Sequence, residues 1–203
     1  MEQELLIKGF ALVLFYVILI GAILFYYYKK QYSFVLASII LLGFTLRLFC
    51  SLDPFLHHWD EQYHALVAKH MLANPFVPKL YLNPVLDFDF KNWGGNEIWL
   101  HKPPLTMWLM ALSMKCFGIS EFAIRIPSLV LSTLCIYLTY KISFHLFKSE
   151  LISLSAAGLH AINGFIIETT AGRVTTDHVD TIFMCLVEIG VYWIILHSKD
   201  NRK

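Results

Sequence analysis

The segment HHWDEQYH, residues 57–64, holds two adjacent carboxylates among three histidines. The carboxylates are Asp60 and Glu61, and on a helix Asp60 and His64 would lie one turn apart on the same face. Such a set can bind a divalent metal ion, or it can supply a general base that removes a proton from a reacting hydroxyl. A solvated polar face on a helix at a membrane surface would carry the same residue types. Spacing alone leaves both interpretations open.

A lysine stands just before a rigid helix start in HKPPLTMW, residues 101–108. Pro103 and Pro104 fix the backbone where an apolar helix is expected to begin. Lys102 can hold a phosphate group as a point charge. It can equally lay its apolar stem along lipid and keep its ammonium in water.

A third polar cluster, GRVTTDHVD, covers residues 172–180. Arg173 and Asp177 are four positions apart and can pair with each other on a helix. Asp177 also suits the N-terminal end of the following helix as a cap. A catalytic role for either residue requires the three clusters to converge in space.

The composition points to lipid as the solvent of most of this chain. Of its 203 residues, 57% are hydrophobic and 15% charged, whereas soluble domains carry about 25% charged residues. The net charge of +1 and the lack of a basic block argue against nucleic acid as a partner. The four cysteines show no metal or redox spacing, so we interpret them as buried small hydrophobic residues.

Five apolar segments are long enough to span a membrane as helices, so the predicted fold class is an all-α polytopic membrane helix bundle. The predicted spans are 9–28, 32–52, 126–147, 151–170 and 178–197. Arg47, near the end of the second span, is expected to snorkel toward water. The segment 53–125 is expected to hold an interfacial helix over 58–73, an irregular loop over 81–100 and a short apolar helix over 103–118 that does not cross the membrane.

The positive charges beside the spans predict their orientation, because cytoplasmic loops are enriched in lysine and arginine. The charges that define the cytoplasmic side are Lys29, Lys30, Lys141, Lys148, Lys199, Arg202 and Lys203. The segments 53–125 and 168–180 are then both extracytoplasmic. Asp60 and Asp177 are therefore expected on the same side of the membrane.

These clusters, in this order and between these spans, resemble the GT-C membrane glycosyltransferases. The resemblance is to the dolichyl-phosphate-mannose protein mannosyltransferases and the bacterial aminoarabinose (lipid A) transferases. WDEQYHALVAKHMLANPFVPKL, residues 59–80, resembles the family's Asp-Glu motif and first external helix, and HKPPL, residues 101–105, its Lys-Pro-Pro segment. FGISEFAIRIPS, residues 117–128, resembles the stretch before the next span, and GRVTTDHVDT, residues 172–181, the second acidic motif.

The resemblance implies a membrane enzyme, in the bacterial inner membrane, that transfers a hexosyl or pentosyl group from a polyprenyl-phosphate donor with inversion. The acceptor would be a hydroxyl of a lipid, glycan or protein on the extracytoplasmic side. By the same resemblance Asp60 is the general base, and Lys102 and Arg173 hold the donor phosphate. Asp177, with Glu61 or His101, would bind a divalent metal ion or orient the site.

The chain departs from the family pattern in its length and in two local features. His101 stands where the aminoarabinose transferases carry an acid, and the span 9–28 precedes the family-like first span. Family members are much longer, so we expect an N-terminal module that transfers no sugar in isolation. The alternative is a non-catalytic membrane protein or partner subunit that binds a polyprenyl-phosphate lipid. Such a protein would need Lys102 and Arg173 but no base.

Overall fold

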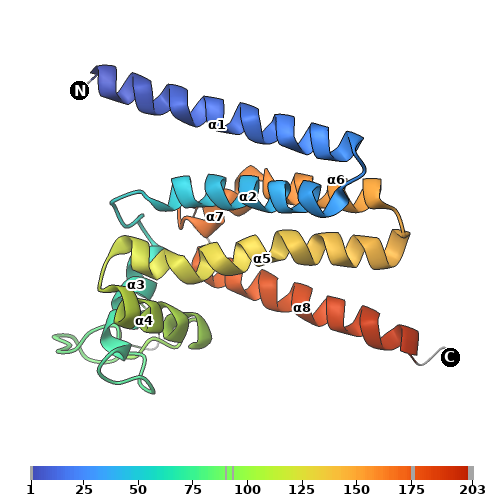
Figure 1. Ribbon diagram of the computed structural model, residues 1–203. Coiled ribbons are helices and arrows are strands. Elements are labelled where there is room, and N and C mark those ends of the chain that lie inside the picture. Colours follow the sequence, from blue (N-terminus) through green and yellow to red (C-terminus); the bar gives the residue numbers. More distant parts are fainter. Residues whose placement is uncertain (1, 90, 93, 175–176, 201–203) are drawn as a thin grey trace. The chain divides into compact units, whose positions relative to one another are not determined.

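The computed structural model describes residues 2–89, 91–92, 94–174 and 177–200, and every regular element within them is an α-helix (Figure 1). This confirms the predicted all-α class. The helices are α1 (Glu2–Tyr28), α2 (Tyr32–Ser51), α3 (Asp60–Met71), α4 (Leu105–Phe117), α5 (Glu121–Phe147), α6 (Glu150–Ala161), α7 (Gly164–Thr170) and α8 (His178–Asp200).

Within the described residues, four helices, α1, α2, α5 and α8, are long and apolar enough to cross a membrane. The predicted span 151–170 is instead divided between α6 and α7, which become a fifth candidate span when counted together. The division falls at Ile162 and Asn163 and is followed by Gly164. Asparagine and glycine are both poor helix formers, which accounts for the break.

The described chain forms two compact units. The first, here called the helical unit, comprises Met1–Leu46, Thr133–Asn163 and Glu188–Lys203. The second, here called the site unit, comprises Arg47–Ser132 and Gly164–Val187 and contains all the predicted site residues. The helical unit has its own apolar core, formed by Val35, Ile39, Ile136, Leu154, Ala157 and Ala161.

In the site unit α3 packs against α4, and the two helices lie side by side in Figure 1. Apolar positions of α3 recur at helical spacing, and they meet a methionine-rich face of α4. The buried core consists of Ala65, Val67, Ala68, Met71, Leu80, Trp99, Met107, Met110, Ala111, Met114, Ala123 and Ile124. This core packs α3 and α4, the two short helices predicted between the second and third spans, into one layer.

A proline inside α5 ties that helix to α4. Pro127 lacks the backbone N–H that would bond the carbonyl of Ala123, four residues earlier. The buried hydroxyl of Ser113 in α4 donates to this carbonyl at 2.5 Å. The side chain thus replaces the missing helix bond and fixes α4 against the start of α5.

The irregular loop after α3 is closed at its base by two short backbone segments. The N–H of Leu80 donates to the carbonyl of Glu97 at 2.7 Å, and that of Trp99 donates to Pro78 at 2.8 Å. An ion pair between Lys79 and Glu97 adds to this closure. Trp99 is thereby buried beneath α3, and the residues that follow it, including Lys102, begin close to that helix.

Arg47 does not snorkel, contrary to the prediction from its place near the end of a span. Its side chain is fully buried in the site unit, and its Nε donates to the hydroxyl of Ser132 at 2.6 Å. The hydroxyl of Thr170 also donates to Ser132, at 2.9 Å. A buried charge needs polar partners of this kind, and no apolar periodicity in the sequence reveals them.

Candidate functional site

Glu61 is the centre of a buried charge cluster. Its side chain accepts hydrogen bonds from Arg125 Nε at 2.8 Å, from His178 Nε2 at 3.0 Å and from the backbone N–H of His57 at 2.6 Å. Burial alone would raise the pKa of Glu61, but the bonds from His178 and Arg125 outweigh it and hold the pKa below its ordinary value. Glu61 is therefore ionised and fully engaged.

Arg125 joins this carboxylate to the end of α2. Its guanidinium is completely buried and also donates to the carbonyls of Ser51, Asp53 and Phe55, at 3.1, 2.5 and 2.6 Å. These carbonyls would otherwise lack partners at a helix end. Arg125 is thus a clamp between α2, α3 and α5.

Gly172 allows the backbone before α8 to approach this cluster. Its φ is +74°, a conformation that favours glycine, and an added Cβ would lie 2.6 Å from Glu61 Oε1 and 2.9 Å from His178 Nε2. Any side chain at this position would displace the charged groups. Sterics therefore explain why the first residue of the GRVTTDHVD motif is a glycine.

Asp177 pairs with His64 of α3. Its carboxylate, 1% exposed, lies 2.7 Å from His64 Nδ1 and accepts the backbone N–H of Val179 at 3.1 Å, so it also caps α8 as predicted. Burial would raise the pKa of Asp177, but the His64 hydrogen bond and the nearby charge of His178 lower it.

Arg173 does not pair with Asp177, so that local interpretation is wrong. The guanidinium instead contacts Asp53 at 3.2 Å and Glu168 at 3.7 Å. Its exposed side chain shows no hydrogen bond or ion pair to Asp60 or Lys102 within the described part of the chain. Of the two predicted phosphate ligands, Lys102 is the one whose charge acts on the pKa of Asp60.

Asp60 begins α3 and is partly exposed. Burial raises its pKa, while the charges of His64, Lys102 and His101 lower it and that of Asp177 raises it. The three clusters come together in the site unit, because His64, one turn after Asp60 on α3, bonds Asp177, and Lys102 contacts Asp180 on α8. Within the described residues Asp60 has no hydrogen-bond or ion-pair partner, in contrast to Glu61 and Asp177.

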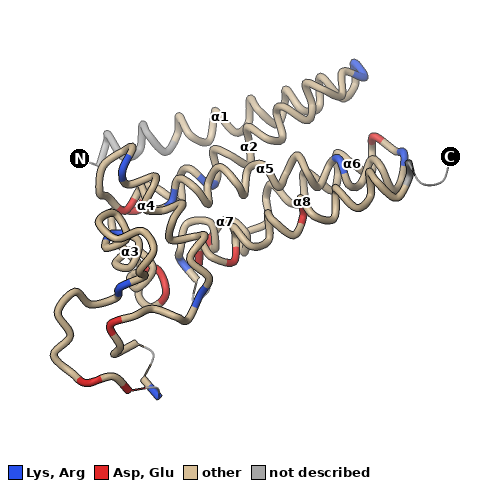
Figure 2. The backbone as a smooth tube through the Cα atoms, turned by 90° about the horizontal axis from the view of Figure 1, so that it is seen from below, with Lys and Arg blue, Asp and Glu red and all other residues tan. Residues whose placement is uncertain are grey.

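Lys102 lies at the edge of this arrangement. Its Nζ is 3.9 Å from Asp180 in the first turn of α8, a weak contact between partly exposed groups. His101 is exposed and sets its ring edge-on to Trp99, with centroids 5.6 Å apart. Acidic and basic residues both occur around α3 and α7 in this unit (Figure 2).

The predicted metal ligands do not form a metal-binding group. Glu61 and Asp177 are occupied by the hydrogen bonds described above, and His101 is exposed beside Trp99. No group of three or more His, Cys, Asp or Glu side chains suited to a metal ion occurs among the residues that the structure describes. These residues therefore do not fit the predicted site, and the chemistry below takes no step through a metal. Dependence on a divalent ion stays a prediction.

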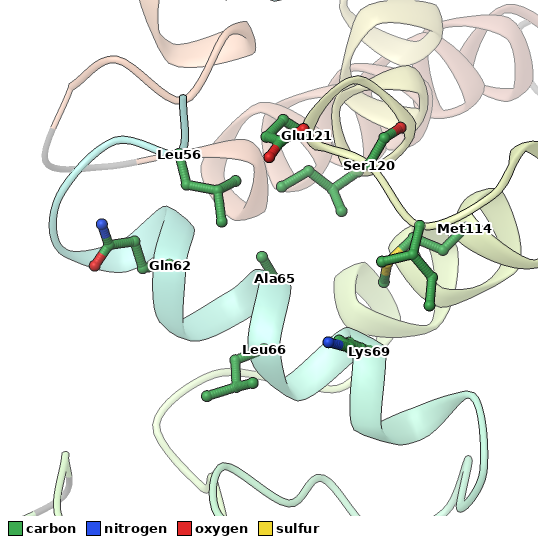
Figure 3. Close-up of a pocket in the computed structure, with 10 residues that line it drawn as sticks. Leu56, Gln62, Ala65, Leu66, Lys69, Met114, Ser120 and Glu121 are labelled. Carbon is green, nitrogen blue, oxygen red and sulfur yellow. The ribbon is translucent and has the colours of Figure 1, made fainter. Parts of the chain in front are cut away.

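A pocket of about 410 Å³ lies on another face of α3 (Figure 3). Gln62, Ala65, Leu66 and Lys69 line it from that helix. Positions 62, 65, 66 and 69 lie on the side of a helix away from positions 60 and 64. This pocket therefore does not contain the carboxylate of Asp60.

Two residues of the cluster, Arg125 and His178, were missed by the sequence analysis. The available signal was weak: Arg125 is a charge between two isoleucines in an apolar run, and His178 directly follows Asp177. A charge in an apolar helix that is expected to be buried calls for a buried partner of opposite sign. The partner, Glu61, is 64 positions away.

The long apolar helices define an integral membrane protein, and the buried charge cluster lies where α2 ends and where α3, α5 and α8 begin. Residues 101–202 match the family model described as dolichyl-phosphate-mannose-protein mannosyltransferase, and the chain belongs to this family. The matched half includes Lys102, Arg125, Arg173 and Asp177. Asp60 lies outside it.

Curated relatives extend this result. The chain is 27% identical over 107 residues to the undecaprenyl phosphate-alpha-4-amino-4-deoxy-L-arabinose arabinosyl transferase of Pseudomonas savastanoi pv. phaseolicola, covering 52% of this chain and 19% of that protein. It is 29% identical over 106 residues to the protein of the same name from Pseudomonas aeruginosa, covering 51% and 19%. An uncharacterized protein of Aquifex aeolicus is 33% identical over 81 residues, covering 40% and 14%. These matches thus span less than a fifth of each relative. No solved structure matches the chain at a significant level.

Proposed function

We propose that this chain carries the base and donor-phosphate side of a membrane glycosyltransferase that uses a polyprenyl-phosphate sugar donor. The environment of the Asp60 carboxylate is the main support for this proposal. It is a half-buried carboxylate without a hydrogen-bond partner in the described chain, and it lies within the fields of Lys102, His101 and Asp177. Family membership and the names of the relatives support the same class of reaction.

The proposed reaction is a single displacement. An acceptor hydroxyl gives its proton to the Asp60 carboxylate while its oxygen forms a bond to the anomeric carbon of the donor sugar. The bond from that carbon to the phosphate oxygen breaks, and the polyprenyl phosphate leaves with the electron pair. The two oxygens lie on opposite sides of the anomeric carbon, so the configuration inverts.

Cations must stabilise the negative charge that develops on the leaving phosphate. We assign this role to Lys102, because its contact with the half-exposed Asp180 is weak and the lysine side chain is partly exposed. Arg173 has five N–H donors, more than its two ion pairs use, and can reach a phosphate from the side of Asp53. The pairing of Asp177 with His64 positions α3, and thus Asp60, against α8.

A non-catalytic lipid-binding subunit is the rival function. It would use the cations equally well but would have no need for an ionisable carboxylate without a partner. Glu61 and Asp177 have structural partners, and Asp60 has none within the described residues. This contrast favours the enzyme.

Replacement of Lys102 by alanine is expected to weaken donor binding. Loss of a charged contact to a phosphate corresponds to about a tenfold or greater rise in Kd. Binding of undecaprenyl phosphate to the purified chain in phosphatidylcholine nanodiscs would be measured by microscale thermophoresis. Lys115→Ala, which removes an exposed lysine at the end of α4, is the matched control. Equal Kd values for Lys102→Ala and Lys115→Ala would remove Lys102 from the phosphate site.

The same variant is expected to shift the pH dependence of transfer. Asp60 must be ionised to accept a proton, and burial raises its pKa above the ordinary value of 3.8. Activity should therefore fall with decreasing pH already above that value. The charge of Lys102 lowers this pKa, so Lys102→Ala should move the acid limb of the kcat profile to higher pH. An acid limb at the same pH in both proteins would contradict the coupling.

The site is expected on the extracytoplasmic side. We would place single cysteines at Val85, which is 96% exposed in the loop after α3, and at the exposed Lys148, in a background with the four native cysteines replaced. A membrane-impermeant maleimide added outside intact cells should label position 85 and spare position 148. The reverse pattern would overturn the proposed orientation.

A further inference from the structure

A second pocket lies beside Asp60, and its chemistry differs from that of the phosphate side. It has a volume of about 280 Å³ and is lined by Trp59, Tyr63, Asn92, Gly94 and Gly95. Among the residues that the structure describes, no charged side chain lines it. Two aromatic rings, an amide and two glycines form its lining.

Trp59 directly precedes the proposed base and is held in an unusual conformation. Its φ is +84° and its ψ is −123°, a backbone region that residues other than glycine rarely occupy. Its side chain is 62% exposed despite being an indole. Strained conformations of this kind cluster at functional sites. The strain here fixes an exposed aromatic surface next to Asp60.

Trp99 separates this pocket from the side that contains Lys102. One neighbour, Tyr63, stacks on the Trp99 ring with centroids 5.4 Å apart and an interplanar angle of 18°. His101 meets the same ring edge-on, and Trp99, His101 and Lys102 line a different pocket of about 450 Å³. The structure thus divides a neutral, aromatic pocket from a cationic one, and α3 lines the first with Tyr63 and the second with Met71.

The amide of Asn92 is held in the neutral pocket by a glycine. Asn92 Oδ1 accepts the N–H of Gly95 at 3.1 Å, which leaves the amide N–H₂ available as a donor. A Cβ on Gly95 would lie 2.7 Å from Asn92 Nδ2 and would displace it. A Cβ on Gly94 would lie 3.6 Å from the hydroxyl of Tyr63, an ordinary contact. Gly95→Ala therefore tests the position of the Asn92 amide.

We propose that this pocket binds a sugar ring of the acceptor, so that the hydroxyl attacked at Asp60 belongs to a carbohydrate. This inference rests on the proposed glycosyl transfer. The C–H face of a pyranose stacks on an aromatic surface such as Trp59, and its hydroxyls hydrogen-bond to amides such as that of Asn92. The neutral lining suits an uncharged ring, whereas the phosphate of the donor is better matched to the side of Lys102.

Ligand binding to the purified chain in phosphatidylcholine nanodiscs tests the proposal. The probes are methyl β-D-glucopyranoside and the peptide acetyl-Ala-Thr-Ala-amide, each followed by saturation-transfer NMR. We expect saturation transfer to the ring protons of the glycoside and none to the peptide. Trp59→Ala should weaken glycoside binding by roughly tenfold, the size of one lost aromatic contact. Gly95→Ala, which displaces the Asn92 amide, should also weaken it. Trp59→Phe, which keeps a ring, should retain it, and so should Asp87→Asn, a change in the same exposed loop at a residue that does not line the pocket.

Undecaprenyl phosphate binding, measured on the same samples, separates this proposal from the proposed function. Trp59→Ala should bind that lipid as the unaltered chain does, which also shows that the variant is folded. Glycoside binding without lipid binding would contradict the donor part of the proposed function and leave the sugar pocket supported. Three results would overturn the sugar pocket. They are no glycoside binding by the unaltered chain, equal glycoside binding by Trp59→Ala, and saturation transfer to the peptide instead of the glycoside.

Discussion

Arg125→Ala is expected to unfold the site unit at temperatures where the unaltered chain is stable. The substitution leaves the Glu61 carboxylate buried without its main cation, and it removes the donor from three backbone carbonyls. Removing one partner of a buried ion pair costs about 3–5 kcal/mol. Because a typical protein is stable by about 5–15 kcal/mol, this is a large share of the total.

Thermal unfolding of the purified chain in detergent, followed by tryptophan fluorescence, measures this effect. Arg173→Ala is the matched control, because it also removes an arginine that pairs with carboxylates but does so at the surface, where such pairs contribute about 0–1 kcal/mol. The Tm of Arg125→Ala should fall well below that of Arg173→Ala. Equal Tm values for the two variants would show that Arg125 is no clamp.

Much of the local structure could be predicted from the sequence. Apolar run length indicated the long helices, and helical spacing of apolar residues indicated α3, whose described bounds are Asp60–Met71. The double proline placed the start of α4 near Leu105. The lysine and arginine bias of the loops predicted that Asp60 and Asp177 lie on the same side of the membrane, and in the structure His64, one turn after Asp60 on α3, bonds Asp177.

The partners within the site could not be predicted in the same way. Arg125 and Glu61 are 64 positions apart, and His64 and Asp177 are 113 apart. Nothing in local spacing reports such pairs, because they depend on how helices pack. Local spacing instead suggested a pair between Arg173 and Asp177, which the structure does not contain. Burial decided the outcome, since a buried Asp177 required a buried donor, His64.

Asp60→Asn is expected to reduce glycosyl transfer by at least about 100-fold, the lower end of what a general base contributes. The amide has nearly the shape of the carboxylate but cannot accept the acceptor's proton. Donor binding should change little, because the phosphate is held by cations on the side of Lys102. Asp60 makes no hydrogen bond or ion pair within the described residues, so its replacement removes no structural partner.

The most direct test is the rate of sugar transfer in membranes where transfer from a polyprenyl-phosphate donor requires this chain. Rates at saturating donor would be compared for the unaltered chain, Asp60→Asn and Asp87→Asn, a control in the exposed loop after α3. We expect the rate of sugar transfer to fall by at least about 100-fold for Asp60→Asn alone, with the Kd for undecaprenyl phosphate unchanged. A rate for Asp60→Asn equal to that of Asp87→Asn would contradict the assignment of Asp60 as the base and favour a subunit that only binds lipid.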